Sequence, residues 1–117
     1  MTTIVVKFIF RSESTVKTVG FYQALGLQFQ ASQHGGPVHF ETVLQDKSIL
    51  EIYTRQTVPL LDCSLIVTVP SLTETLALLE MKGYITHADT QKRSSFVDGV
   101  SVVDPDGRVV IITEQHE

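Results

Sequence analysis

The sequence contains a single cysteine, Cys63, no tryptophan and only four prolines among its 117 residues. One cysteine permits neither an internal disulfide nor a cysteine-rich zinc site, which favours a reducing compartment such as the cytoplasm. Long apolar runs are also missing. The N-terminal run 4–10 is short, contains Lys7 and lacks a small-residue cleavage site, so we expect neither a signal peptide nor a membrane span.

Positive charge is scarce and scattered. Nine Lys and Arg residues stand against thirteen Asp and Glu residues, which gives a net charge of −4. Such a chain offers no basic surface for nucleic acid or for anionic lipid. The hydrophobic share of 43% and the charged share of 19% are ordinary for a globular protein. We therefore expect one compact domain that binds neither nucleic acid nor a membrane.

Signals for secondary structure occur in the same order twice. β-branched and aromatic runs predict strands at 4–10, 27–33, 38–44 and 48–53 in the first half, and at 64–69, 84–88, 96–103 and 108–113 in the second. Helical spacing predicts a helix over 15–25 that ends at Gly26. A second helix begins at the Ser71–Glu74 capping box and ends at Gly83.

This order predicts an α+β fold made of two βαβββ modules, at about 1–54 and 63–117, within a single domain. We expect curved mixed sheets around a concave groove, with the helices outside. Each module is too small to be securely stable alone, so the two must share their packing.

Three segments carry a family resemblance. They are Phe21–Leu27 (FYQALGL), Leu50–Ile52 (LEI) and Val103–Gly107 (VDPDG) followed by VVI at 109–111. In this order and spacing they resemble a helix end, a fourth strand and a closing strand of the vicinal-oxygen-chelate superfamily. That superfamily includes glyoxalase I, bleomycin-resistance proteins, fosfomycin-resistance enzymes and extradiol dioxygenases.

The resemblance implies where a metal would bind. Family enzymes hold a divalent ion through four side chains, typically His and Glu, from the first and last strands of both halves. The matching positions here are Lys7, Glu51, Ser64 and Ile111. Only Glu51 is an ordinary ligand, because a lysine ammonium repels a cation and isoleucine has no donor atom. We therefore expect no metal, no cofactor and none of the family's metal-dependent catalysis.

Lys7 is the most informative of these positions. Alternation along the first strand places Lys7, Ile9 and Arg11 on one face. Glu51 and Tyr53 of the fourth strand face the same way, so we expect a Lys7–Glu51 pair with the ammonium roughly where the family has its metal. Three roles remain open for this pair: a structural remnant, an anchor for a polar ligand group, or a catalytic lysine with a depressed pKa.

The four histidines form no His-x-His or i, i+4 pair. We expect His34, His39, His87 and His116 to be solvated or to cap turns; the alternative is that His39 lines the groove with Glu41. Cys63 is expected to be an inert small apolar residue.

The favoured function is metal-independent binding of an aromatic or amphipathic small molecule, as in the bleomycin-resistance branch. The predicted ligand-binding residues are Lys7, Ile9, Arg11, Glu51, Tyr53, Ser64, Ile66 and Ile111. The alternatives are a lyase-, isomerase- or dioxygenase-like superfamily enzyme with a rearranged site, and a dimeric interaction module with a filled cavity. We also expect a homodimer, because the resemblance implies sites that draw on both chains and because half-sheets leave open edges.

Overall fold

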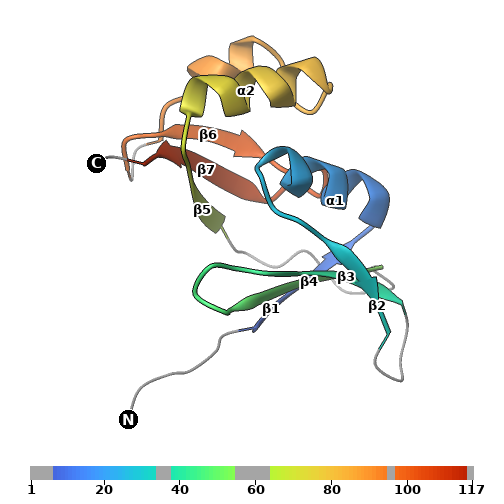
Figure 1. Cartoon of the computed structure of the whole chain (residues 1–117). Coiled ribbons are helices and arrows are strands. Elements are labelled where there is room, and N and C mark those ends of the chain that lie inside the picture. The colour runs from blue at the N-terminus through green and yellow to red at the C-terminus, as the bar shows by residue number, and fades with distance from the viewer. Residues whose placement is uncertain (1–6, 34–37, 55–63, 95–96, 116–117) are drawn as a thin grey trace.

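The computed structural model describes residues 7–33, 38–54, 64–94 and 97–115 of the chain, so His34, Cys63 and His116 lie outside the described residues. Within these ranges two α-helices and seven strands form two sheets, each covered on one face by a helix (Figure 1). The predicted α+β fold is therefore confirmed. No helix in the described part of the chain is long and apolar enough to cross a membrane.

The N-terminal sheet has four strands in the order β1-β4-β3-β2. Its elements are β1 (Lys7–Ser12), α1 (Thr15–Ala24), β2 (Gln30–Ser32), β3 (His39–Val43) and β4 (Ile49–Thr54). β1 runs parallel to β4, and the other pairs are antiparallel. Ser14 caps α1 by accepting a hydrogen bond from the Lys17 amide, and Gly26 ends the helix turn at a φ of 100°.

The C-terminal sheet repeats this arrangement with three strands in the order β5-β7-β6. Its elements are β5 (Ser64–Val69), α2 (Leu72–Met81), β6 (Val100–Val103) and β7 (Val109–Glu114). β5 is parallel to β7, as β1 is to β4. The serine half of the predicted capping box is present, because the Ser71 hydroxyl accepts a hydrogen bond from the Glu74 amide at 3.2 Å.

The strand predicted at 84–88 is wrong. A 3₁₀ helix, η1 (Ala88–Gln91), begins where that strand was expected to end. The Thr86 amide donates to the Asp89 carboxylate at 2.8 Å, and the Asp89 amide donates back to the Thr86 hydroxyl at 3.3 Å. These side-chain bonds close a local turn, which competes with strand pairing despite the β-branched residues.

The segment 92–94 takes the edge position beside β6 instead. The Ser101 amide donates to the Lys92 carbonyl at 2.7 Å, and the Ser94 amide donates to the Gly99 carbonyl at 3.0 Å. A single bridge joins Arg93 to Val100. The second strand of the C-terminal module, predicted at 84–88, is thus replaced by a single bridge further along the chain.

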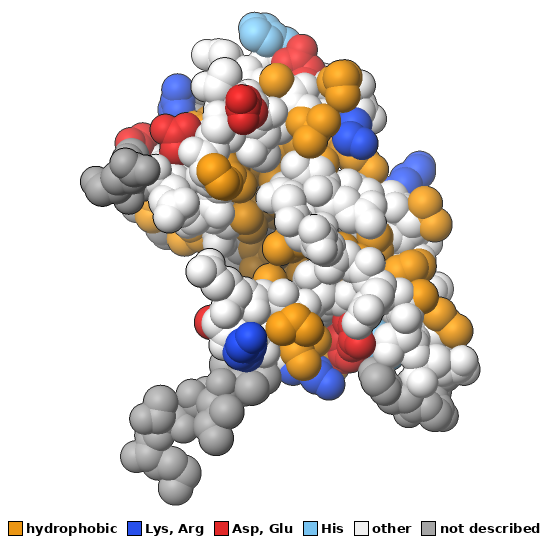
Figure 2. Space-filling view, viewed as in Figure 1, with side chains coloured by type: hydrophobic (Ala, Val, Ile, Leu, Met, Phe, Trp, Pro, Cys, Tyr) orange, Lys and Arg blue, Asp and Glu red, His pale blue; other side chains and the backbone are white. Residues whose placement is uncertain are grey.

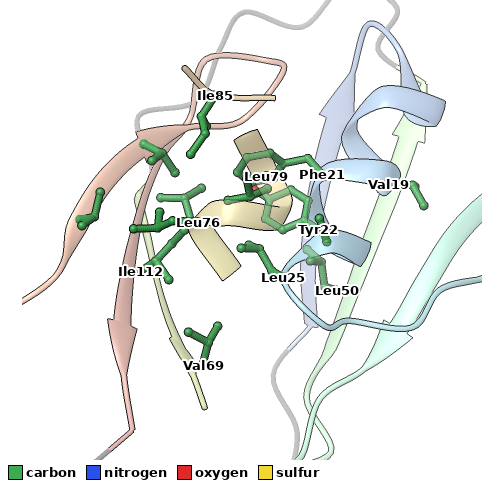
Figure 3. Packing of buried hydrophobic residues seen from close by; sticks show 14 of the residues in the cluster. Val19, Phe21, Tyr22, Leu25, Leu50, Val69, Leu76, Leu79, Ile85 and Ile112 are labelled. Carbon is green, nitrogen blue, oxygen red and sulfur yellow. The ribbon is translucent and has the colours of Figure 1, made fainter. Parts of the chain in front are cut away.

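The core joins the two halves through their helices. Phe21 and Tyr22 of α1, Leu79 of α2, Ile52 of β4 and Ile112 of β7 are all completely buried. Figure 3 shows the side chains of both helices meeting between residues of the two sheets. Burying each such side chain contributes about 1.5–3 kcal/mol, so separating the two halves would destabilise both.

A buried polar cluster at the VDPDG turn forms a second link between the halves. The Asp104 carboxylate accepts hydrogen bonds from the Tyr22 hydroxyl at 2.7 Å and from the Arg108 guanidinium at 3.0 Å. Arg108 also donates to the Arg11 carbonyl at 2.6 Å. The motif that resembles a family turn is therefore the place where β7 is tied to α1 and β1.

Asp106 of the same turn should make stability depend on pH. Burial alone would raise the pKa of Asp106, but hydrogen bonds from Thr18 and from the Glu13 amide outweigh it, so that the pKa lies below its ordinary value. A lowered folded-state pKa stabilises the fold above the unfolded pKa, and this contribution is lost as the pH falls through the folded value.

We therefore expect the free energy of unfolding to fall as the medium is acidified below about pH 4, the ordinary range of an aspartate. Urea titrations across this range measure it. Asp106→Asn should give a shallower decline than the wild type, and an identical slope would contradict the assignment.

Candidate functional site

Five of the predicted ligand-binding residues share one face of the N-terminal sheet. Along β1, Phe10 and Ser12 are buried toward α1, whereas Lys7, Ile9 and Arg11 point to the opposite face. In register, Ile9 lies beside Glu51 and Arg11 beside Tyr53 on β4. The period-two prediction for these residues is confirmed.

Glu51 is the centre of this group. Its side chain is 3% exposed, and its Oε2 atom lies 3.7 Å from Lys7 Nζ. The Tyr53 hydroxyl donates to Oε1 at 3.4 Å. The predicted Lys7–Glu51 pair is therefore present, although half of the Lys7 side chain is exposed. An ammonium with that much solvent access costs little to retain.

His39 is the residue that the sequence analysis misplaced. Its side chain is 2% exposed, and Nε2 lies 3.1 Å from Glu51 Oε2 and 3.7 Å from Glu41 Oε2. The expectation of a solvated or capping histidine is wrong here, because the buried imidazole lies beside Glu41 and Glu51. That His39 lines a groove with Glu41 stays a prediction. Alternation on β3, which puts His39 and Glu41 on one face, was the available signal.

Tyr53 covers this group. Its ring stacks on His39 with centroids 4.4 Å apart and an interplanar angle of 17°. The Arg11 guanidinium carbon lies 5.6 Å from the Tyr53 ring centroid, within the range of a cation–π contact. Burial, followed by the charge of Glu51 and the hydrogen bond to it, raises the pKa of Tyr53. Tyr53 therefore stays a neutral donor near neutral pH.

The four positions that the resemblance assigns to a metal do not fit one. Lys7 places a cation beside the only carboxylate among them, Glu51. Ser64 and Ile111 lie on the other sheet, and Ile111 offers no donor atom. These side chains cannot form the family's four-ligand site.

The remaining predicted residues, Ser64, Ile66 and Ile111, line a pocket of about 380 Å³ on the C-terminal sheet. Ile66 on β5 is paired with Ile111 on β7, and Ile111 with Ser101 on β6. The pocket lies on the face of the sheet opposite the buried Val110 and Ile112. Its lining includes no residue of the N-terminal group, so one chain brings the predicted site together as two separate groups.

Four pocket residues were not predicted: Arg93, Ser94, Ser101 and Val109. Strand alternation and register with Ile111 and Ser64 could have identified Ser101 and Val109. Arg93 and Ser94 fall between the strands predicted at 84–88 and 96–103, and no sequence signal placed them beside β6.

Comparison with known proteins supports the fold. No family model matches the chain, and no curated protein matches it in sequence. Solved structures match over nearly the whole chain, among them proteins described as glyoxalases, so the chain shares the fold that the motifs predicted.

Three of these structures illustrate the likeness. TnmS3, an antibiotic-binding protein from Streptomyces sp. CB03234, is 19% identical with a TM-score of 0.72, over 98% of each chain. A glyoxalase/bleomycin resistance protein from the same organism is 19% identical with a TM-score of 0.65, over 95% of this chain and 99% of that one. A possible glyoxalase from Bacillus cereus is 13% identical with a TM-score of 0.66, over 93% and 96%. At these identities the likeness establishes the fold alone.

Proposed function

We propose that this protein binds an aromatic or amphipathic small molecule against the C-terminal sheet, without the metal that the family resemblance implies. The observation that carries the proposal is the pocket of about 380 Å³, which lies within the range of about 300–1,000 Å³ typical of ligand sites. A pocket of this size favours a ligand over the alternative of a filled cavity. A single cysteine favours the cytoplasm as the compartment.

The lining indicates what kind of molecule fits. Ile66, Val109 and Ile111 form an apolar floor that suits a flat hydrophobic body. Arg93 adds a planar cation, and Ser101 adds a hydroxyl, which suit an anionic or carbonyl group on that body. TnmS3, which shares this fold, is an antibiotic-binding protein, and this is in keeping with a ligand of this class.

We further propose that the active form is a homodimer in which the N-terminal group of one copy completes the pocket of the other. Ile9 is 44% exposed and Ile66 is 56% exposed, each on the sheet face turned away from its helix. Figure 2 shows hydrophobic side chains in a hollow at the middle of the visible face. Within the described ranges β1 pairs only with β4 and β5 only with β7, which leaves an edge on each for a partner.

Sedimentation tests the dimer. The wild type should sediment at twice the chain mass of 13.0 kDa. Ile9→Glu should shift the protein to the monomer because it places a charge in the apolar contact, whereas Val16→Glu, on the exposed side of α1, should not. A wild type that sediments as a single 13.0 kDa species would contradict the dimer.

A charge on the pocket floor should abolish most ligand binding. Ile66 is largely exposed, so Ile66→Glu should fold normally, but a bound apolar ligand would bury the new carboxylate. We expect at least about a tenfold loss of affinity, or 1.4 kcal/mol, for any compound found by thermal shift. The matched control is Val16→Glu, at a site 76% exposed on α1. Equal affinities of the two variants would place the ligand elsewhere.

A further inference from the structure

Three side chains of the N-terminal sheet form a group that shares Glu51 with the predicted ligand site and adds two residues of β3. His39 and Glu41 lie two residues apart on β3, and Glu51 is the register partner of Glu41 on β4. One ligand atom from each residue lies within 4.8 Å of the other two. An imidazole nitrogen and two carboxylate oxygens therefore converge on one point.

The spacing of these atoms suits a small divalent ion. His39 Nε2 lies 3.1 Å from Glu51 Oε2 and 3.7 Å from Glu41 Oε2. Zinc binds nitrogen and oxygen at about 2.0–2.2 Å, so neighbouring ligands around a tetrahedral ion lie about 3.3 Å apart. The observed distances lie on either side of that value, and small side-chain rotations would equalise them.

Electrostatics also favours a cation at this point. Glu41 and Glu51 face each other across two antiparallel strands, a placement in which like charges destabilise a sheet. Glu51 is moreover almost completely buried, where an uncompensated carboxylate is costly. Lys7 supplies a compensating charge at 3.7 Å, but its half-exposed side chain is free to swing away from an incoming ion.

We propose that His39, Glu41 and Glu51 bind one divalent transition-metal ion, with zinc as the model ion. This site differs from the family set that the resemblance implies, because all three ligands come from one sheet and two of them from β3. Its mixed nitrogen and oxygen donors suit zinc better than calcium, which takes six to eight oxygens. The proposal does not rest on ligand binding at the C-terminal pocket.

Calorimetric titration of the untagged, EDTA-treated full chain with Zn²⁺ tests the site. The wild type should bind one ion per chain at this site, and His39→Gln and Glu41→Gln should each weaken binding at least about tenfold. Lys7→Met should tighten it, because the competing ammonium is removed. The controls are His87→Gln and Glu80→Gln, which alter an exposed His–Glu pair 3.5 Å apart and should change nothing.

Two results would overturn the proposal: no zinc binding by the wild type, or wild-type affinity in Glu41→Gln. Because His39 is buried, the fold of His39→Gln is checked by circular dichroism. Glu41 is more exposed, so Glu41→Gln decides the matter if the histidine variant fails to fold. Weaker binding by Lys7→Met would also contradict the site, since removal of an ammonium 3.7 Å from Glu51 should raise the affinity for a cation there.

Discussion

Asp104→Ala is expected to lower the free energy of unfolding by about 3–5 kcal/mol, the usual cost of breaking a buried ion pair from one side. The Asp104 carboxylate accepts from the Tyr22 hydroxyl and the Arg108 guanidinium, and also from the backbone amides of Asp106 and Arg108. Alanine would remove the carboxylate that accepts the hydrogen bonds of these donors. Arg108, which is 8% exposed, would lose one of its two carboxylate partners and keep the other, Asp106, at 3.0 Å.

Urea unfolding followed by circular dichroism measures this loss. Asp98→Ala, an exposed aspartate that precedes β6, is the matched control and should change stability by less than about 0.5 kcal/mol. A loss below about 1 kcal/mol for Asp104→Ala would show that the turn does not tie the two halves together.

Glu51→Ala should have the second largest effect, a loss of about 3 kcal/mol, whereas Lys7→Met should be nearly neutral. Glu51 is buried and contacts His39, Lys7 and Tyr53, so its removal takes away the partner of a buried imidazole and of a partly buried hydroxyl. Lys7 is half exposed and can be solvated without its partner. The contrast follows from burial, although the two residues form one pair.

Thermal unfolding of the two variants, measured side by side, tests this difference in stability. If Lys7→Met costs as much as Glu51→Ala, the ammonium is an essential part of the fold. If Lys7→Met is neutral in stability and leaves ligand binding unchanged, Lys7 is a structural remnant and does not anchor a ligand.

Local signals predicted most of the fold because they act over a few residues. Ser14 and Ser71 cap the two helices, and Gly26 and Gly83 adopt the positive φ values of 100° and 80° that end them. The segment 84–88 was mispredicted because its apolar pattern suits a strand, while the reciprocal bonds of Thr86 break that pattern locally. The hydrophobic pattern does not show whether strand formation or the local turn is the more stable of the two.

The candidate site was predictable only in part, for a different reason. Alternation placed Lys7 and Glu51 on one face, and their pairing followed from charge. The burial of His39 depends on Tyr53 stacking over it, a contact between strands whose register the sequence does not specify. Arg93 reaches the pocket only because the edge of the sheet moved to 92–94, which depends on tertiary packing.

The most direct test of the proposed metal-independent ligand binding is chemical-shift mapping of a bound compound in the presence of EDTA. A compound that raises the melting temperature of the protein in a thermal-shift screen is titrated into isotope-labelled protein, and the backbone amide shifts are followed. We predict that the largest changes occur around Ile66, Arg93 and Ile111 and that chelation leaves the affinity unchanged. Binding that requires added metal, or shifts confined to residues away from the C-terminal sheet and its dimer contacts, would contradict the proposed function.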